Sequence, residues 1–430
     1  MQQPSRIAAG IVAVAIVVVA AVVGPGSDAT VVPATGPLTG THLIGAEAGA
    51  EWIAAQFNAQ GFIPSPIDAT QANPGITRQA ALTLTVLGRH HATAEAAYDW
   101  LATHLDVATD ADGHDLPGVL AELILVATAL HHDATAVGGI GATHDLVARL
   151  EATRRTTGSD AGLFGNQSPL FDGAYRQGLA LRALGAVGVS DAPAEEWLLA
   201  QQCADGSWMA YRPATDALCP APDPVGFTGP DTNSTAAAVL GRAAVGTTPA
   251  HDPLPAFDAF EAAGGGWSYF GGPAPSDPNS TALVIDAIDA SGADPSAARF
   301  TRGNVTAFDA LLAFQLGCAA PADARGAFWF ATNDDGTVSP DLMASIQAAT
   351  ALAIGGATTA DAVINAICSD VTTTTSTTTT TTSAGPTTTT TTTALTTTST
   401  TTTTTTPTEV LSVETARAAT PVPAVVHYAG

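Results

Sequence analysis

Internal repetition limits the fold of this chain more than any other feature of its sequence. A unit of roughly 45 to 60 residues occurs six times between Thr41 and Asp370, and periods of this length are typical of repeat architectures. Each unit combines a first helical segment, a turn rich in Gly and Asp, and a second helical segment rich in Ala and Leu. We therefore expect six helical hairpins, since no long alternating pattern predicts a competing sheet.

The second segment of each unit carries the clearest helical signals. Leu120, Leu123 and Ile124 recur with the spacing of one helix face. Asp231 and Asp277 each begin such a segment, where a carboxylate can accept bonds from free helix amides. The expected anchor residues of the two segments, unit by unit, are Trp52 and Gln79, Trp100 and Leu116, Asp145 and Tyr175, Trp197 and Asp231, Phe257 and Asp277, and Phe308 and Leu342.

A single hairpin cannot cover its own apolar face, so the six hairpins must either stack in an open row or close into a ring. The number of units and the lack of polar capping repeats at the two ends favour closure. We predict an all-α fold, an (α/α)6 toroid of six helical hairpins over residues 42–370, with the second helices forming its inner layer.

The two ends of the chain do not resemble the repeats. Arg6 precedes an apolar run, and a Gly-Pro-Gly break and small residues follow it, so residues 1–29 are expected to be a signal peptide or an uncleaved N-terminal anchor. A linker follows at residues 30–41. Residues 371–407 are nearly all threonine and predict a disordered, low-complexity stalk, with a short tail at 408–430. These features predict an exported protein that is extracellular or associated with the cell surface or wall.

The charge and the cysteines agree with that location. The formal net charge is −25, so the surface repels nucleic acid and anionic lipid. We expect no nucleic-acid partner, membrane contact only through an uncleaved N-terminal segment, and a monomer. The four cysteines predict disulfides in an exported chain, and short loops favour the pairs Cys203–Cys219 and Cys318–Cys368, although four cysteines allow three pairings.

One motif adds a family resemblance. The stretch from Gln202 to Trp208 fits the pattern Q-x-x-x-G-x-W, and Gly265-Gly266-Trp267 repeats its end with Glu261 in the glutamine position. This pattern resembles the repeats of squalene–hopene cyclases and of protein prenyltransferase β subunits, a superfamily of terpenoid cyclase-like and prenyltransferase-like proteins. The resemblance implies an alpha/alpha toroid with a central cavity. It does not imply one function, because unrelated activities share that ring.

The acid motif of class II cyclases is incomplete in this chain. Those enzymes protonate an alkene with the central acid of an Asp-x-Asp-Asp motif. The matching stretch here keeps its first residue, Asp231, but has Asn233 in the place of the proton donor. Asp277 and Asn279 repeat the same pattern in the next unit, and helix capping explains both carboxylates. Asp231 and Asp277 are the only catalytic candidates, and the sequence favours a protein that is not an enzyme.

A polar rim is the main candidate for binding. If the second helices form the inner layer, their N-terminal ends meet at one rim, where helix amides add positive potential. A polar mouth above apolar walls suits an amphiphilic ligand, while a filled ring centre with ordinary caps is the alternative. The predicted ligand-binding residues are Arg78, Gln79, Arg176, Gln177, Asn233, Asn279 and Asp341.

Histidine pairs are the main candidates for a metal site. His90 and His91 follow the second helix of unit one, and His131 and His132 follow that of unit two. Histidine near a helix C-terminus is also favoured by the helix dipole. We therefore expect no metal and no cofactor.

These features together predict an exported, cyclase-like, non-catalytic module that binds a hydrophobic or amphiphilic small molecule, or a protein partner, at the cell surface. The alternative is a secreted enzyme that acts on a terpenoid or polysaccharide substrate in the cavity of the toroid.

Overall fold

The computed structural model describes residues 41–111, 114–138, 143–167 and 171–354. The predicted signal peptide, linker, stalk, tail and Cys368 lie outside this part of the chain. The described residues belong to one compact unit. No described helix is both long enough and apolar enough to cross a membrane.

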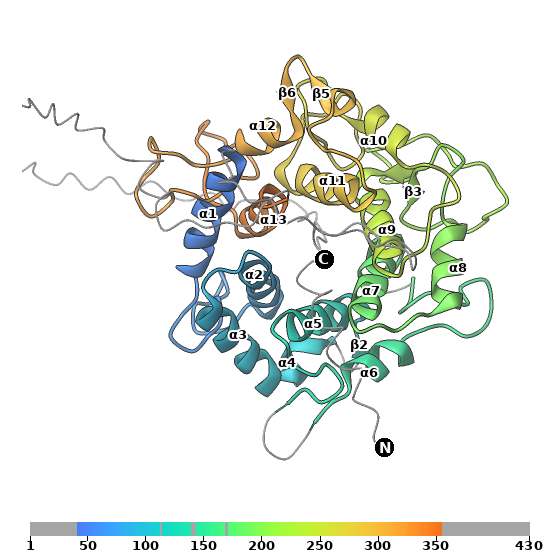
Figure 1. Cartoon of the computed structure of the whole chain (residues 1–430), viewed down its shortest axis with the longest axis horizontal. Helices are drawn as coiled ribbons and strands as arrows, with labels where there is room; N and C mark the ends of the chain where they lie inside the picture. The colour runs from blue at the N-terminus through green and yellow to red at the C-terminus, as the bar shows by residue number, and fades with distance from the viewer. Residues whose placement is uncertain (1–40, 112–113, 139–142, 168–170, 355–430) are drawn as a thin grey trace, which may run out of the picture. The chain divides into compact units, whose positions relative to one another are not determined.

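Two layers of helices form the described part (Figure 1). The inner helices are α2 (Pro74–Val86), α5 (Pro117–Ala129), α7 (Ala174–Ala186), α9 (Thr232–Ala244), α11 (Pro278–Ala290) and α13 (Leu342–Leu352). The outer helices are α1 (Thr41–Ala54), α3 (His91–Thr103), α4 (Leu105–Thr109), α6 (Leu146–Ala152), α8 (Ala192–Ala200), α10 (Leu254–Phe260) and α12 (Ala307–Leu312), with a 3-10 turn at Ala298–Phe300.

Three small antiparallel ribbons lie in the turns between these layers. They pair β1 (Asp110–Ala111) with β2 (His114–Asp115), β3 (Trp208–Met209) with β4 (Pro230–Asp231), and β5 (Thr301–Arg302) with β6 (Val305–Thr306). Each ribbon has only two residues per strand, so the described fold is essentially all-α.

The ring is closed. Each inner helix packs on the next in chain order, and α13 packs on both α2 and α1. The hydroxyls of Thr83 and Thr350 lie 2.9 Å apart across the closing contact, and the indole of Trp52 donates to the carbonyl of Asp323 at 3.0 Å. The predicted toroid, with the second helix of every hairpin on the inside, is confirmed.

One hydrogen bond recurs in five of the six hairpins. A side-chain oxygen on the first turn of the inner helix accepts the backbone N–H of a buried apolar residue in the preceding turn. Such a bond holds the turn against the helix and contributes about 1 kcal/mol. The donor and acceptor residues are Ile63 and Thr77, Phe164 and Gln177, Trp208 and Thr235, Trp267 and Thr281, and Phe328 and Ser345. In the second hairpin the equivalent position is Leu120, and the β1–β2 ribbon occupies the turn.

Two residues before each of these donors stands a glycine with positive φ. Because it lacks a Cβ, the backbone of the next hairpin can approach it. An added Cβ would lie 2.4 Å or less from a carbonyl oxygen of that hairpin in four cases, which are Gly61 with Ala96, Gly162 with Pro193, Gly206 with Asp252, and Gly326 with Ala48. The last of these contacts joins the sixth hairpin to the first.

The glutamine position of the motif also bonds to the next hairpin. Gln202 donates to the carbonyl of His251 at 2.7 Å and accepts the N–H of Ala250 at 2.9 Å. Gln315 donates to the carbonyl of Gly45 at 2.8 Å, which adds a second tie between the sixth and first hairpins. In the fifth hairpin Glu261 takes this position and pairs with Arg302 at 3.0 Å.

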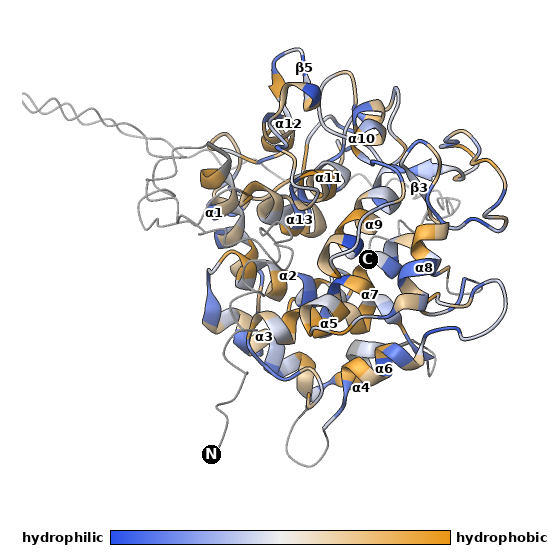
Figure 2. Cartoon of the chain, turned by 45° about the vertical axis from the view of Figure 1, so that its right-hand side comes forward, coloured by the Kyte–Doolittle hydropathy of each residue, from blue (hydrophilic) through white to orange (hydrophobic). Residues whose placement is uncertain are grey.

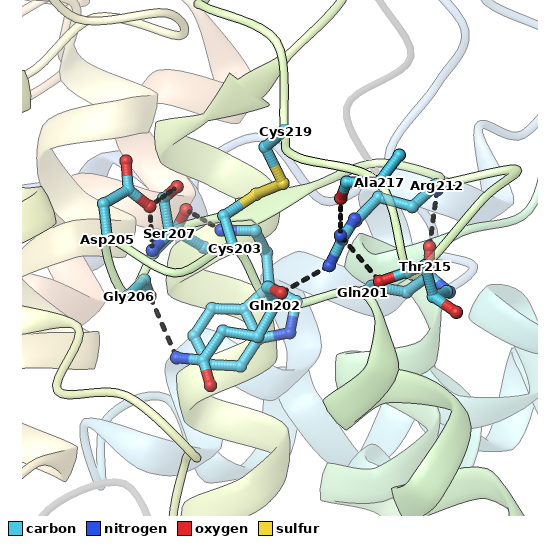
Figure 3. Close-up of a disulfide and its surroundings, with 12 residues drawn as sticks. Gln201, Gln202, Cys203, Asp205, Gly206, Ser207, Arg212, Thr215, Ala217 and Cys219 are labelled. Carbon is cyan, nitrogen blue, oxygen red and sulfur yellow. Dashed lines mark hydrogen bonds between the residues drawn. A yellow bond between two sulfur atoms is a disulfide. The ribbon is translucent and has the colours of Figure 1, made fainter.

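The disulfide Cys203–Cys219 is present, as predicted, and closes the long turn of the fourth hairpin (Figure 3). Arg212 lies within the same loop and donates to the carbonyls of Gln202 and Ala217. Cys318 is disulfide-bonded too, while Cys368, its expected partner, lies outside the described residues.

We predict that Gly326→Ala opens the ring contact between the sixth and first hairpins. The new Cβ would lie 2.4 Å from the carbonyl oxygen of Ala48, so the free energy of unfolding should fall by about 3 kcal/mol or more in urea denaturation. Gly336→Ala is the matched control, because Gly336 also has positive φ but has no atom within 4 Å of the added Cβ. That variant should lose only about 1 to 2 kcal/mol. Equal losses in both variants would contradict the role of the Gly326 contact.

Candidate functional site

One face of each inner helix is not covered by a neighbouring helix. On α7 the partly exposed positions include Tyr175, Leu179 and Arg182, while the residues between them, such as Ala180 and Leu181, are buried. Since other helices pack on the remaining faces of α7, this stripe points toward the centre of the ring. Four of these helices, α2, α5, α7 and α11, each carry a partly exposed leucine that adds apolar surface at the centre. These are Leu82, Leu125, Leu179 and Leu283.

A buried ion pair joins α2 to α5 on this inner side. Arg78 Nε lies 2.6 Å from one carboxylate oxygen of Glu122, and Gln79 Nε2 donates to the other at 2.7 Å. The side chains of Arg78 and Glu122 are almost fully buried. The two charges compensate each other, so this side of the ring carries little net charge.

The opposite side, between α7 and α11, holds a second polar group of residues. Asp286 of α11 interacts electrostatically with Arg182 of α7 across the intervening helix α9. Burial raises the pKa of Asp286 to about 7, the neighbouring Arg182 charge lowers it in part, and Asp289 raises it further. The oxygen Oδ1 of Asp286 is buried and has no hydrogen-bond partner. Figure 2 shows hydrophilic positions on these inner helices among mainly hydrophobic ones.

Aromatic residues lie at the N-terminal end of the same inner helices. The backbone carbonyl oxygen of Tyr269 accepts the N–H of Thr232, the first residue of α9. Its ring stacks on Phe227 at 4.9 Å and meets Phe270 edge-on at 4.8 Å. Tyr269 also interacts electrostatically with Tyr175, and burial raises the pKa of both phenols, that of Tyr175 to about 12. An aromatic cluster therefore borders the centre where α7 and α9 begin.

The two predicted catalytic carboxylates act as helix caps. Asp231 accepts the N–H of Ser234 at 2.6 Å, and Asp277 accepts the N–H of Ser280 at 2.8 Å. Burial raises the pKa of Asp231 to about 7 and also raises the pKa of Asp277, while these amide bonds oppose the shift. Asn233, which stands in the proton-donor position of the cyclase motif, has a buried amide oxygen without a partner.

The structure divides the predicted ligand-binding residues into two groups. Most of them bond to other residues of the fold. Gln177 is fully buried and bonds to Phe164, Gly162 and Ala194. Arg78 pairs with Glu122, Arg176 pairs with Asp172, and Asp341 caps α13. The others, Gln79, Asn233 and Asn279, keep one buried amide oxygen without a partner. These three belong to the N-terminal turns of α2, α9 and α11.

Three of the four histidines lie against glutamate side chains. His90 lies 2.9 Å from Glu51, while His132 and His91 approach the two oxygens of Glu95 at 2.8 and 3.5 Å. His131 is exposed with positive φ. In the part of the chain that the structure describes, no group of three His, Cys, Asp or Glu residues is arranged to hold a metal ion.

Sequence analysis missed the residues that face the centre at mid-helix, which are Glu122, Arg182, Asp286 and Gln347. Gln347 of α13 also has a buried oxygen without a partner. Each of the four is flanked on both sides by an alanine or a larger apolar residue, and that interruption was the available signal. A charge on a helix that packs on several sides can avoid burial only on the uncovered face.

Comparison with known proteins gives structural likeness only. No family model and no curated protein sequence matches the chain. Among solved structures, the type II terpene cyclase MstE from Scytonema is 14% identical, with 72% of this chain and 97% of that chain covered at a TM-score of 0.47. The ent-copalyl diphosphate synthase from Streptomyces platensis is 18% identical, with 82% and 77% covered at a TM-score of 0.35.

We predict that the protein is more stable in mild acid than in mild base. The pKa of Asp231, Glu261 and Asp286 is raised to about 7, so the folded chain binds protons that the unfolded chain has released. Their stabilising contribution is complete below about pH 4 and is lost as the pH rises through 7. Urea denaturation should give a free energy of unfolding lower at pH 8 than at pH 5, by at most about 2 to 3 kcal/mol per group.

Asp286→Asn tests the assignment, because it should reduce this pH dependence and raise the stability at pH 8. Asp68→Asn is the control, since Asp68 is exposed and its pKa is lowered by bonds from Thr70. Asp68→Asn should leave the loss of stability between pH 5 and pH 8 in place. A pH profile that is unchanged in Asp286→Asn would show that this carboxyl is not raised in the folded state.

Proposed function

We propose that this chain is a binding protein that holds a hydrophobic or amphiphilic small molecule at the centre of its helical ring. The observation that carries the proposal is the mixed character of the inward faces. There, partly exposed leucines alternate with charged side chains that form no hydrogen bond or ion pair with any described residue. Leu179 and Arg182 on α7, and Leu283 and Asp286 on α11, repeat this pattern at one-turn spacing. A bound molecule with an apolar body and a polar group would satisfy both kinds of residue.

The absence of the cyclase acid supports binding over family chemistry. Asn233 stands in the donor position, and an amide cannot deliver an acidic proton. Asp231, the remaining acid of the motif, accepts an amide bond at the start of α9.

Export belongs to the same proposal. The apolar N-terminal run, the threonine-rich tract and the acidic composition support a location outside the cytosol, and the Cys203–Cys219 disulfide is compatible with it. The ring would then capture its ligand outside the cell or at its surface.

A second candidate is an enzyme acting at the same centre. The carboxyl group of Asp286 has a pKa near neutrality and lies beside an arginine, which are properties of a general acid. If purified protein converts its co-purified molecule, and if Asp286→Asn abolishes conversion without loss of binding, the enzyme would be favoured.

We predict that organic extraction of the purified full chain releases a small amphiphile that mass spectrometry detects. Leu179→Trp should reduce the amount bound at least about ten-fold, because the larger side chain occupies the centre of the ring. Ile67→Trp is the matched control, since Ile67 is 96% exposed on the outside of a turn. Native mass spectra that show no bound molecule in the unmodified chain, before or after incubation with lipid extracts, would refute ligand binding.

A further inference from the structure

The arginines of this protein are almost all committed to internal bonds. The sequence has fourteen basic residues, all arginine, and Arg6 and Arg417 lie outside the described residues, which leaves twelve. Eleven of the twelve have a partner in the structure: carboxylates for Arg78, Arg89, Arg149, Arg154, Arg176 and Arg302; Asn166 for Arg155; backbone carbonyls for Arg212, Arg242 and Arg325; and the ring of Phe300 for Arg299.

Arg182 is the exception. It makes no hydrogen bond and no ion pair with any residue that the structure describes. It lies in the middle of α7, partly exposed on the inward stripe between Leu179 and Ala186. The guanidinium is partly exposed on the inward stripe, so its N–H donors remain available to a molecule bound at the centre of the ring. The protein is strongly acidic, and such a donor group is therefore unusual at this place.

Asp286, the acid that interacts with Arg182, does not bond to it. Asp286 interacts with Arg182 electrostatically, but no ion pair forms and its Oδ1 has no partner. With a pKa near 7, this carboxyl is protonated in a large fraction of molecules at neutral pH. In that form its O–H can donate a hydrogen bond, so Arg182 and Asp286 together can present donors to a single acceptor group.

We propose that the centre of the ring recognises the carboxylate of an amphiphilic acid, with Arg182 as its anion-binding residue and Asp286 as a second donor. A guanidinium matches a carboxylate with two parallel N–H bonds. A single unpaired arginine beside an acid balances one negative charge, which fits a carboxylate better than a diphosphate. This inference rests on the proposed function and specifies the class of ligand.

The apolar part of the ligand would extend along α7 toward the aromatic cluster. Tyr175 lies seven residues before Arg182 on the same stripe, which corresponds to about 10 Å along the helix axis. Leu179 stands between them, and Leu283 contributes from α11. The head group would then lie at mid-helix and the apolar chain would point to the N-terminal end, where Tyr175 and Tyr269 meet.

The test uses three probes with one twelve-carbon chain: dodecanoate, dodecanol and dodecylammonium. Titration calorimetry on the full chain should show dodecanoate binding at least about ten-fold more tightly than dodecanol, as expected for hydrogen bonds to a charged group. Arg182→Gln should reduce that preference to less than about three-fold, while Arg182→Lys keeps part of it. Arg299→Gln, at an exposed arginine that lies over Phe300, should leave the preference unchanged.

The outcomes separate the two proposals. Equal binding of all three probes, or preference for dodecylammonium, would overturn the carboxylate assignment while keeping ligand binding in the ring. A preference for dodecanoate that survives in a folded Arg182→Gln variant would also overturn it. Failure of all three probes to bind would remove both the assignment and the proposed function.

Discussion

Ring closure in this protein depends on how closely the turn of each hairpin approaches the backbone of the next. A glycine with positive φ in the turn leaves room for a carbonyl of the following hairpin, and the same device joins Gly326 to Ala48 where the ring closes. The recurring bond from the turn to the first turn of the inner helix fixes the position of that glycine. Because each hairpin covers the apolar face of its neighbour, the closed ring leaves no end exposed.

This closure determines where polar side chains can lie. An inner helix is covered by its two neighbours and by the outer layer, so only one stripe faces the centre. Charges on that stripe are partly desolvated, which explains the raised pKa of Asp286 and the burial of the Arg78–Glu122 pair. The ring therefore creates a polar site from residues that are far apart in sequence.

The two sides of the centre differ in how their charges are satisfied. Between α2 and α5, Glu122 receives bonds from both Arg78 and Gln79, so both of its carboxylate oxygens are bonded. Between α7 and α11, the Oδ1 atom of Asp286 has no hydrogen-bond partner, and Arg182 forms no ion pair with any described residue. A charged group whose hydrogen bonds are all made within the protein stabilises the fold. A charged group without such bonds can instead bond to a ligand.

The sequence alone determined the hairpins, their order and the inner layer, because helix periodicity, Asp caps and the Gln202–Trp208 motif are local signals. It also identified the Cys203–Cys219 disulfide from a short loop. It could not determine which polar residues face the centre, since that depends on which side of each inner helix the neighbours cover. Gln177 and Asp341 were expected at the rim but serve the fold, whereas Arg182 and Asp286 were passed over. Only the closed ring brings α7 and α11 to the same space, and burial there decides their chemistry.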